Sequence, residues 1–179
     1  SYNTAVGGFA GGSNTTGQTN TFVGGLAGNK NTTASNNVAI GNDALSTNTT
    51  GAQNTAVGKQ ALMRSTTSSN NTAVGFTALD HNTTGSENTA VGRDALSANT
   101  TAANNVAVGY QALLTNTEGA QNTAVGWNAL RATTTGDDNV AVGKRALDAN
   151  TTASSNTAVG TNAGLVITTG AADTIVGSG

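Results

Sequence analysis

The sequence predicts an all-β protein, a parallel β-solenoid in which each coil is one 17-residue repeat. An NTAVG-like element recurs every 17 residues along the 179-residue chain, and no insertion breaks the spacing. A constant period indicates stacked units that supply each other's contacts. Seventeen residues are too few for a helix pair of about 34 or a propeller blade of about 40. Asn, Thr and Gly are also poor helix formers, which favours strands.

The repeat defines ten complete coils and part of an eleventh. With the first Asn as column 1, the unit reads N-[T/V]-A-V-G-x-x-A-[L/G]-x-x-N-T-T-[G/A/S]-x-x. The complete copies begin at Asn3, Asn20, Asn37, Asn54, Asn71, Asn88, Asn105, Asn122, Asn139 and Asn156, and the partial one begins at Asp173. At about 4.8 Å per coil the rod would be about 50 Å long. We take residues 1–179 as a single solenoid domain and expect it to be a segment of a longer fibre, because neither end reads as a polar cap.

Each part of the unit has its own expected conformation. Columns 2–4, T-A-V or V-A-V, predict a strand, and the Gly in column 5 predicts a turn that needs positive φ or has no room for a Cβ. Columns 6–11 fit a second short strand or a single helical turn, and we favour the strand. Columns 12–15, N-T-T-G, have the composition of a second corner, with the column 13 Thr in a hydrogen-bonded ladder.

The charged residues separate a variable face from a regular one. All seven Lys and Arg and all nine Asp and Glu lie in columns 6, 7, 10, 11, 16 and 17, except Glu118 and Asp173. These columns therefore predict the solvent face. Columns 3 and 4 are both apolar although successive strand residues point to opposite sides. If column 4 fills the solenoid, as Val57 would, column 3 needs a second dry surface, and we expect a side-by-side homotrimer to provide it. A monomer with a tolerated small apolar face is the alternative.

Composition excludes several classes of protein. A net charge of −2 with periodic apolar positions does not fit a disordered chain, and the absence of Cys excludes disulfides. No apolar run approaches the roughly 18 residues of a membrane helix, so no membrane insertion of this segment is expected. The scattered cations form no basic stripe, so we expect no nucleic acid partner.

The N-[T/V]-A-[V/I]-G element resembles a known family. NNVAIGNDAL at residues 36–45 is similar to the N-S-V-A-I-G element in the heads of trimeric autotransporter adhesins. The stretch from Asn105 to Leu113 looks like repeats of phage tail fibres and bacterial surface proteins. The resemblance implies a left-handed parallel β-roll, three chains side by side, and attachment outside the cell. Adhesin heads of that family use about 14 residues per repeat, so a 17-residue coil must differ in at least one corner.

Catalytic and metal-binding patterns are weak. The only His is His81, and without Cys it cannot complete a usual nucleophile–base–orienter set, so we expect no enzyme and no cofactor. Asp137, Asp138 and Asp148 carry oxygen ligands, but calcium prefers six to eight, and a solvated acidic corner is favoured. Seven sequons match the N-glycosylation pattern, at Asn14, Asn31, Asn48, Asn70, Asn82, Asn99 and Asn150. We attribute their recurrence to corner geometry.

Column 6 holds the strongest candidate for recognition. In coils 5 to 9 it reads Phe76, Arg93, Tyr110, Trp127 and Lys144, which places aromatic and cationic side chains on one exposed line. Such a line suits a surface glycan or a protein receptor, although the rings could instead pack over neighbouring chains. We therefore expect a structural or adhesive fibre segment on a cell surface or virion. The alternative is an ice-binding solenoid that uses the Thr of column 13.

Overall fold

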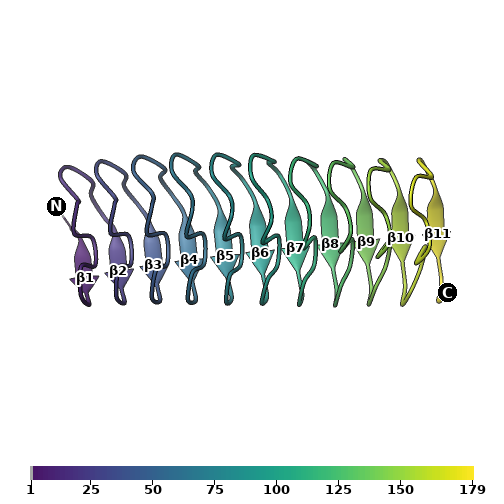
Figure 1. Ribbon diagram of the computed structural model, residues 1–179, viewed down its shortest axis with the longest axis horizontal. Coiled ribbons are helices and arrows are strands. Elements are labelled where there is room, and N and C mark those ends of the chain that lie inside the picture. The colour runs from purple at the N-terminus through teal and green to yellow at the C-terminus, as the bar shows by residue number, and fades with distance from the viewer. Residues whose placement is uncertain (1) are drawn as a thin grey trace.

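A computed structural model of the protein describes residues 2–179. It is a straight rod of stacked coils in which each coil contributes one three-residue strand, and the two ends of the chain lie at opposite ends of the rod (Figure 1). The strands are β1 (Thr4–Val6), β2 (Thr21–Val23), β3 (Val38–Ile40), β4 (Thr55–Val57), β5 (Thr72–Val74), β6 (Thr89–Val91), β7 (Val106–Val108), β8 (Thr123–Val125), β9 (Val140–Val142), β10 (Thr157–Val159) and β11 (Thr174–Val176). The predicted parallel β-solenoid is confirmed.

The eleven strands form one parallel sheet whose order follows the chain. Each residue pairs with the residue one repeat away, as Thr55 does with Thr72 and Val57 with Val74. The 17-residue spacing seen in the sequence is therefore the register of the sheet. The part of the chain described here contains no helix, and hence none that could cross a membrane.

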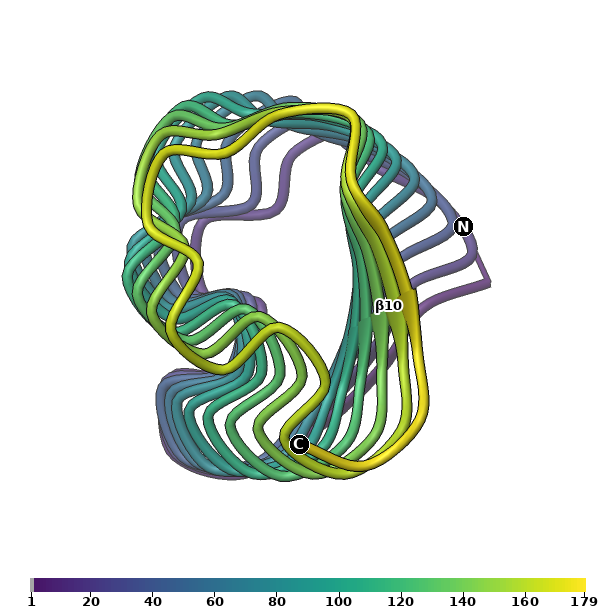
Figure 2. The same ribbon diagram turned by 90° about the vertical axis from the view of Figure 1, so that its right-hand side faces the viewer.

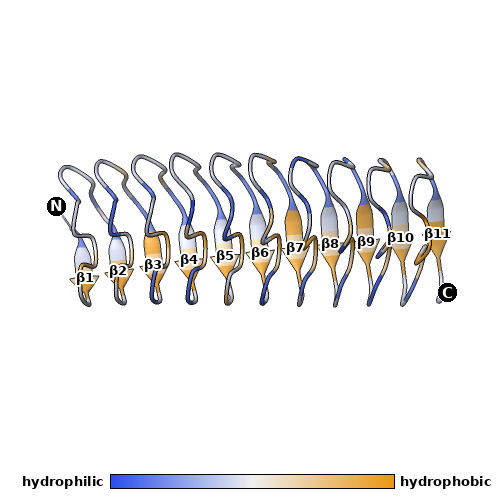
Figure 3. Cartoon of the chain, viewed as in Figure 1, coloured by the Kyte–Doolittle hydropathy of each residue, from blue (hydrophilic) through white to orange (hydrophobic). Residues whose placement is uncertain are grey.

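The strand residues point inward at column 3 and outward at columns 2 and 4. The column 3 alanines from Ala39 to Ala158 are fully buried, whereas column 4 is partly exposed, with Ile40 at 40% and Val142 at 37%. Val57 thus faces outward, and the arrangement with column 4 filling the solenoid is wrong. Alternation along a strand requires one of the two columns to face out, and the narrow interior accepts the smaller side chain. Figure 3 shows the second half of the strands coloured as apolar, and β3, β7 and β9 apolar over their whole length, because Val replaces Thr in their column 2.

The core is completed by columns 8 and 9, which are both buried although they are adjacent. Ala and Leu can both point inward because the column 9 leucines have φ between 50 and 55°, and Leu62 is fully buried. The residues before them, in column 7, also have positive φ, so columns 6–11 form successive turns. The second strand predicted for these columns is wrong. Residues with positive φ in columns 7 and 9 turn the chain sharply, and the end-on view shows the resulting folded outline (Figure 2).

Two ladders of buried asparagine brace the other side of each coil. In column 1, the Oδ1 of one Asn accepts a hydrogen bond from the backbone N–H of the next, as Asn54 does from Asn71 at 3.0 Å. In column 12, Asn99 Nδ2 donates to Asn82 Oδ1 at 2.8 Å and to the Ala102 carbonyl at 3.0 Å. The column 13 threonines donate to the next Thr carbonyl, as Thr83 does to Thr100 at 3.0 Å, which confirms the predicted ladder.

The column 12 asparagine ladder also determines which N-glycosylation sequons are accessible. Asn31, Asn48, Asn82, Asn99 and Asn150 are fully buried, and their Nδ2 atoms already donate hydrogen bonds within the coil. Their side chains are therefore closed to a glycan in the folded rod. Asn70, in column 17, is exposed and differs from them in this respect.

Candidate functional site

The turn that follows each strand projects column 6 from one long edge of the rod. Column 5 Gly accepts a hydrogen bond from the column 8 N–H, as Gly92 does from Ala95 at 3.3 Å, so column 6 lies at the tip of a tight turn. The column 6 carbonyl accepts from column 7 of the next coil, as Arg93 does from Gln111 at 3.0 Å. These bonds hold successive tips in register.

Phe76, Arg93, Tyr110, Trp127 and Lys144, which we call the column 6 row, lie in consecutive coils on this edge. Arg93 has its guanidinium carbon 5.8 Å from the Phe76 ring centroid and 5.7 Å from that of Tyr110. Lys144 places Nζ 5.4 Å from the Trp127 centroid. These distances are within the range of cation–π contacts. The five residues of the sequence-derived line thus form two contact groups in consecutive coils, Phe76–Arg93–Tyr110 and Trp127–Lys144.

The row remains open to solvent. Phe76 is 43% exposed, Tyr110 37% and Trp127 45%. Each ring keeps a large part of its surface available because the turn tip has nothing packed beyond it among residues 2–179. Arg93 also forms an ion pair with Asp94, with 3.2 Å between Nε and Oδ2. The row therefore offers flat apolar surface and positive charge at a step of about 4.8 Å per coil.

A second charged cluster lies beside the row, and sequence reasoning did not find it. The Arg131 Nε donates to Asp148 Oδ1 at 2.7 Å and the Arg145 Nε donates to Asp148 Oδ2 at 3.0 Å. Asp148 is 3% exposed, although column 10 was predicted to face solvent. The three charged residues in columns 7 and 10 of adjacent coils could have indicated an ion-pair cluster from the sequence. That inference requires the turn geometry, which brings the two columns together.

A third cluster surrounds Asp80 in coil 5. Asp80 is 7% exposed and its Oδ1 has no hydrogen-bond partner within residues 2–179. His81 Nδ1 lies 3.5 Å from Asp80 Oδ2 and 3.2 Å from the Ser97 carbonyl oxygen. Burial raises the pKa of the Asp80 carboxyl, and the charges of His81 and Arg64 oppose that rise.

The acidic residues weighed as calcium ligands do not come together. Asp148 binds the two arginines, whereas Asp137 accepts a hydrogen bond from the Ala120 N–H at 2.7 Å on another corner of the coil. Across residues 2–179 no three His, Asp or Glu side chains are grouped as a metal site requires. Comparison with protein-family models, with curated proteins and with solved structures found no match to this chain.

Proposed function

We propose that the chain is a rigid extracellular rod, a segment of a cell-surface adhesin or phage-type tail fibre, that attaches to a surface through the column 6 row. The observation that carries the proposal is this uninterrupted row on a solenoid whose hydrogen bonds run along the rod axis. A rod of this kind holds its side chains at fixed spacing, which lowers the entropy lost on binding. Its resemblance to adhesin heads and tail-fibre repeats supports the same role.

We further propose that three copies pack side by side through the outer face of the sheet. This face carries Thr or Val in column 2 and Val or Ile in column 4 along all eleven strands. Its column 4 residues form a long apolar strip, and association would remove that strip from water. In this arrangement column 6 stays free, because it lies at the turn beyond the strand end.

Attachment is tested on a glycan array and a panel of extracellular-matrix proteins with the wild type and Trp127→Ala. We expect retention of the wild type on a subset of ligands and at least about a tenfold loss for the variant. Thr161→Ala, a column 6 change outside the row, is the matched control. Equal binding by Trp127→Ala and wild type would remove the row from the proposal.

The assembly is tested by sedimentation equilibrium. We expect a mass three times the 17.4 kDa of the chain. The double variant Val91→Lys/Val108→Lys places charge on the outer face and should give a folded monomer, whereas Thr84→Lys/Thr101→Lys, in exposed column 14, should not. A wild-type species at the monomer mass would refute the trimer.

Ice binding is the second candidate, because Thr occupies columns 13 and 14 in nearly every coil. Two features disfavour it. The column 13 hydroxyls are engaged with carbonyls, as in Thr49 to Thr66 at 3.0 Å, and the coils fan out when viewed end-on (Figure 2), so their faces twist. A flat crystal plane fits a flat array better. Thermal hysteresis in the wild type, lost in Thr84→Lys/Thr101→Lys, would make ice binding the preferred function.

A further inference from the structure

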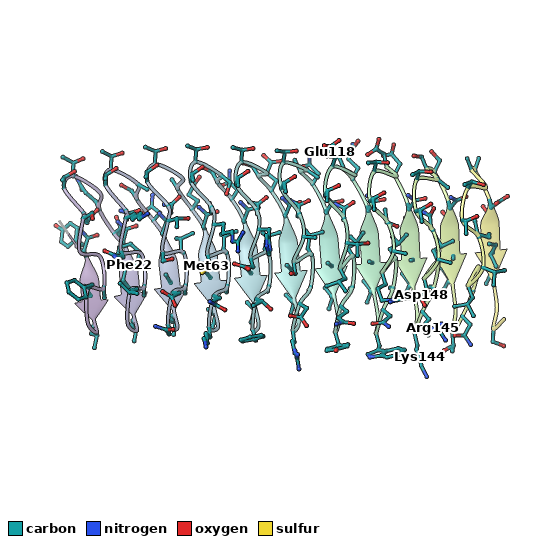
Figure 4. The ribbon with its side chains drawn as sticks, viewed as in Figure 1. Phe22, Met63, Glu118, Lys144, Arg145 and Asp148 are labelled. Carbon is teal, nitrogen blue, oxygen red and sulfur yellow. The ribbon has the colours of Figure 1, made fainter. Side chains whose placement is uncertain are left out.

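Charge is separated across the rod. All seven cationic residues lie in columns 6, 7, 10 and 11: Lys30, Lys59, Arg64, Arg93, Arg131, Lys144 and Arg145. They outnumber the four acidic residues of these columns, Asp43, Asp80, Asp94 and Asp148. Five of the nine acidic residues lie in columns 14, 16, 17 and 1: Glu87, Glu118, Asp137, Asp138 and Asp173. Figure 4 shows Lys144 and Arg145 at one edge and Glu118 at the opposite edge. Because the whole chain has a net charge of −2, the positive edge is a local feature that would orient the rod toward an anionic surface.

The two arginines of coils 8 and 9 share one carboxylate. Asp148 binds Arg131 with one oxygen and Arg145 with the other, and both contacts use Nε. The Nη groups of these arginines have no acceptor among residues 2–179, and the side chains are 43% and 41% exposed. Two guanidinium groups are thus anchored on one carboxylate through Nε, and their terminal N–H donors are left unpaired among residues 2–179.

The same two coils provide a stacking surface. Trp127 belongs to coil 8 with Arg131, and Lys144 belongs to coil 9 with Arg145. Lys144 Nζ lies 5.4 Å from the Trp127 ring centroid, and the ring is 45% exposed. We call these four residues, together with Asp148 as their positioning residue, the coil 8–9 patch. It joins one aromatic platform to three cations and one buried carboxylate.

We propose that the coil 8–9 patch binds an acidic polysaccharide, with a sugar ring on Trp127 and its carboxylate or sulfate groups on Arg131, Arg145 and Lys144. The inference rests on the proposed attachment function and names its ligand class. A sugar unit in an extended chain is about as long as one coil step, so the chain can run along the row and reach Tyr110. Nucleic acid fits less well, because the cations flank one ring and do not line a continuous phosphate path.

Fluorescence provides a direct test, because Trp127 is the single tryptophan of the chain. The full chain is titrated with oligogalacturonate, heparin oligosaccharide, neutral malto-oligosaccharide and a DNA oligonucleotide. We expect at least one acidic oligosaccharide to change Trp127 emission, with an affinity at least about tenfold above that of the neutral sugar and reduced by salt. Oligogalacturonate carries carboxylates alone, so its binding shows that carboxylates suffice, whereas binding of heparin alone shows that sulfate or a higher charge density is required.

Variants separate the patch from general charge attraction. Lys144→Gln leaves the Asp148 ion pairs intact and should weaken binding about tenfold, whereas Lys59→Gln, in column 6 of coil 4, should change it less than about twofold. Asp148→Asn makes the edge more positive yet should weaken binding, because the arginines lose their common anchor. Tighter binding by Asp148→Asn would refute the positioning role, and a circular dichroism spectrum equal to wild type verifies that each variant is folded.

The outcomes distinguish this inference from the function on which it rests. Equal affinity for neutral and acidic sugars, or tighter binding to the oligonucleotide, would overturn the assignment of an acidic polysaccharide as the ligand. Either result would leave a Trp127-dependent attachment role in place. No change of emission with any sugar, together with loss of all row-dependent signals on the array and protein panel, would overturn both.

Discussion

The buried asparagines of columns 1 and 12 show how one residue type can serve a repeating backbone. An amide side chain carries both a donor and an acceptor, so identical residues one coil apart satisfy each other. The Asn71 side chain illustrates this, since its Nδ2 donates to Asn54 Oδ1 at 3.2 Å and its Oδ1 accepts from the Asn88 backbone N–H at 3.0 Å. An apolar residue of the same size would leave these buried groups unpaired.

Column 12 departs from Asn at Ser65, Thr133 and Ile167, and the departure at Thr133 leaves an acceptor unpaired. Thr133 replaces Asn in coil 8 and donates instead to the Asn150 carbonyl, so the buried Asn116 Oδ1 has no partner within residues 2–179. Thr133→Asn should supply the missing donor and stabilise the fold by about 1 kcal/mol, measured by urea denaturation. Ser65→Asn is the comparison, because Ser65 already pairs with Ser68 at 2.6 Å. We expect no gain there, and equal gains at both sites would contradict the ladder explanation.

Asp80 predicts a pH dependence of stability. Burial raises the pKa of Asp80 in the folded state above the ordinary value of 3.8, which applies to the unfolded chain. At pH values between the unfolded-state and folded-state pKa, the folded state therefore binds more protons than the unfolded state. Stability from this group therefore falls as pH rises through that window. Asp80→Asn should stabilise the protein by about 1 kcal/mol at pH 7 and give no gain at pH 3, because the carboxyl is then protonated. Chemical denaturation at both pH values checks this; Asp43→Asn removes the same charge in column 7. A loss of stability at pH 7 would show that the His81 contact outweighs burial.

At the scale of the turn, the column 5 glycines meet two requirements at once. Gly75 has φ of 139°, and a Cβ there would lie 2.5 Å from the Gly92 carbonyl oxygen in the next coil. Gly75→Ala should therefore cost about 3 kcal/mol or more. Gly8→Ala is the control, because a Cβ on Gly8 meets no atom within 4 Å, and its cost should be below about 0.5 kcal/mol. Similar midpoints of thermal unfolding for both variants would remove this account of the repeated glycine.

In the core, a large side chain in column 3 is accompanied by a glycine in column 9 of the same coil. Where column 3 is Phe22, column 9 is Gly28, whose added Cβ would collide with the Phe22 ring. Phe22→Ala alone should cost about 3 kcal/mol by leaving a cavity. Phe22→Ala/Gly28→Leu restores the Ala and Leu of the middle coils and should recover at least about half of that loss. Gly28 has φ of 56°, near that of the column 9 leucines, so the backbone already suits Leu. If the double variant were no more stable than Phe22→Ala, the exchange would not hold.

The repeat could be predicted well from the sequence, and the path of the chain within it less well. The period and the column 5 turn follow from a position that never varies, such as Gly58, and the strand follows from columns 2–4, which vary little. The inward column did not follow, because Ala56 and Val57 are both apolar and equally regular. Left-handed Leu62 was not foreseen either, since leucine rarely adopts that region and only the stacked coils hold it there. The column 6 row needed the period alone, whereas the Arg131–Asp148–Arg145 cluster needed the turns that bring columns 7 and 10 together.

At the scale of the whole molecule, stability is distributed along one dimension. Contacts are made within a coil or with the next coil, so the free energy of unfolding should be approximately a sum over coils and their interfaces. The strand pairing is the same at every step from β1 to β11. A coil can therefore be removed without changing the environment of the others, provided that a whole period is removed.

Deletion of residues 54–70 tests this additivity. The cut joins Gln53 to Asn71 and brings the column 12 Asn48 next to Asn82, so the amide ladder continues without the Ser65 variant. We expect a folded rod about 4.8 Å shorter by small-angle X-ray scattering, with a small loss of stability. Deletion of residues 54–69 leaves one extra residue at the junction and shifts every later column by one position, which turns Ala73 outward. That variant should lose cooperative unfolding, because its two halves cannot stack in register; equal cooperativity in both deletions would show that the 17-residue period does not set the register.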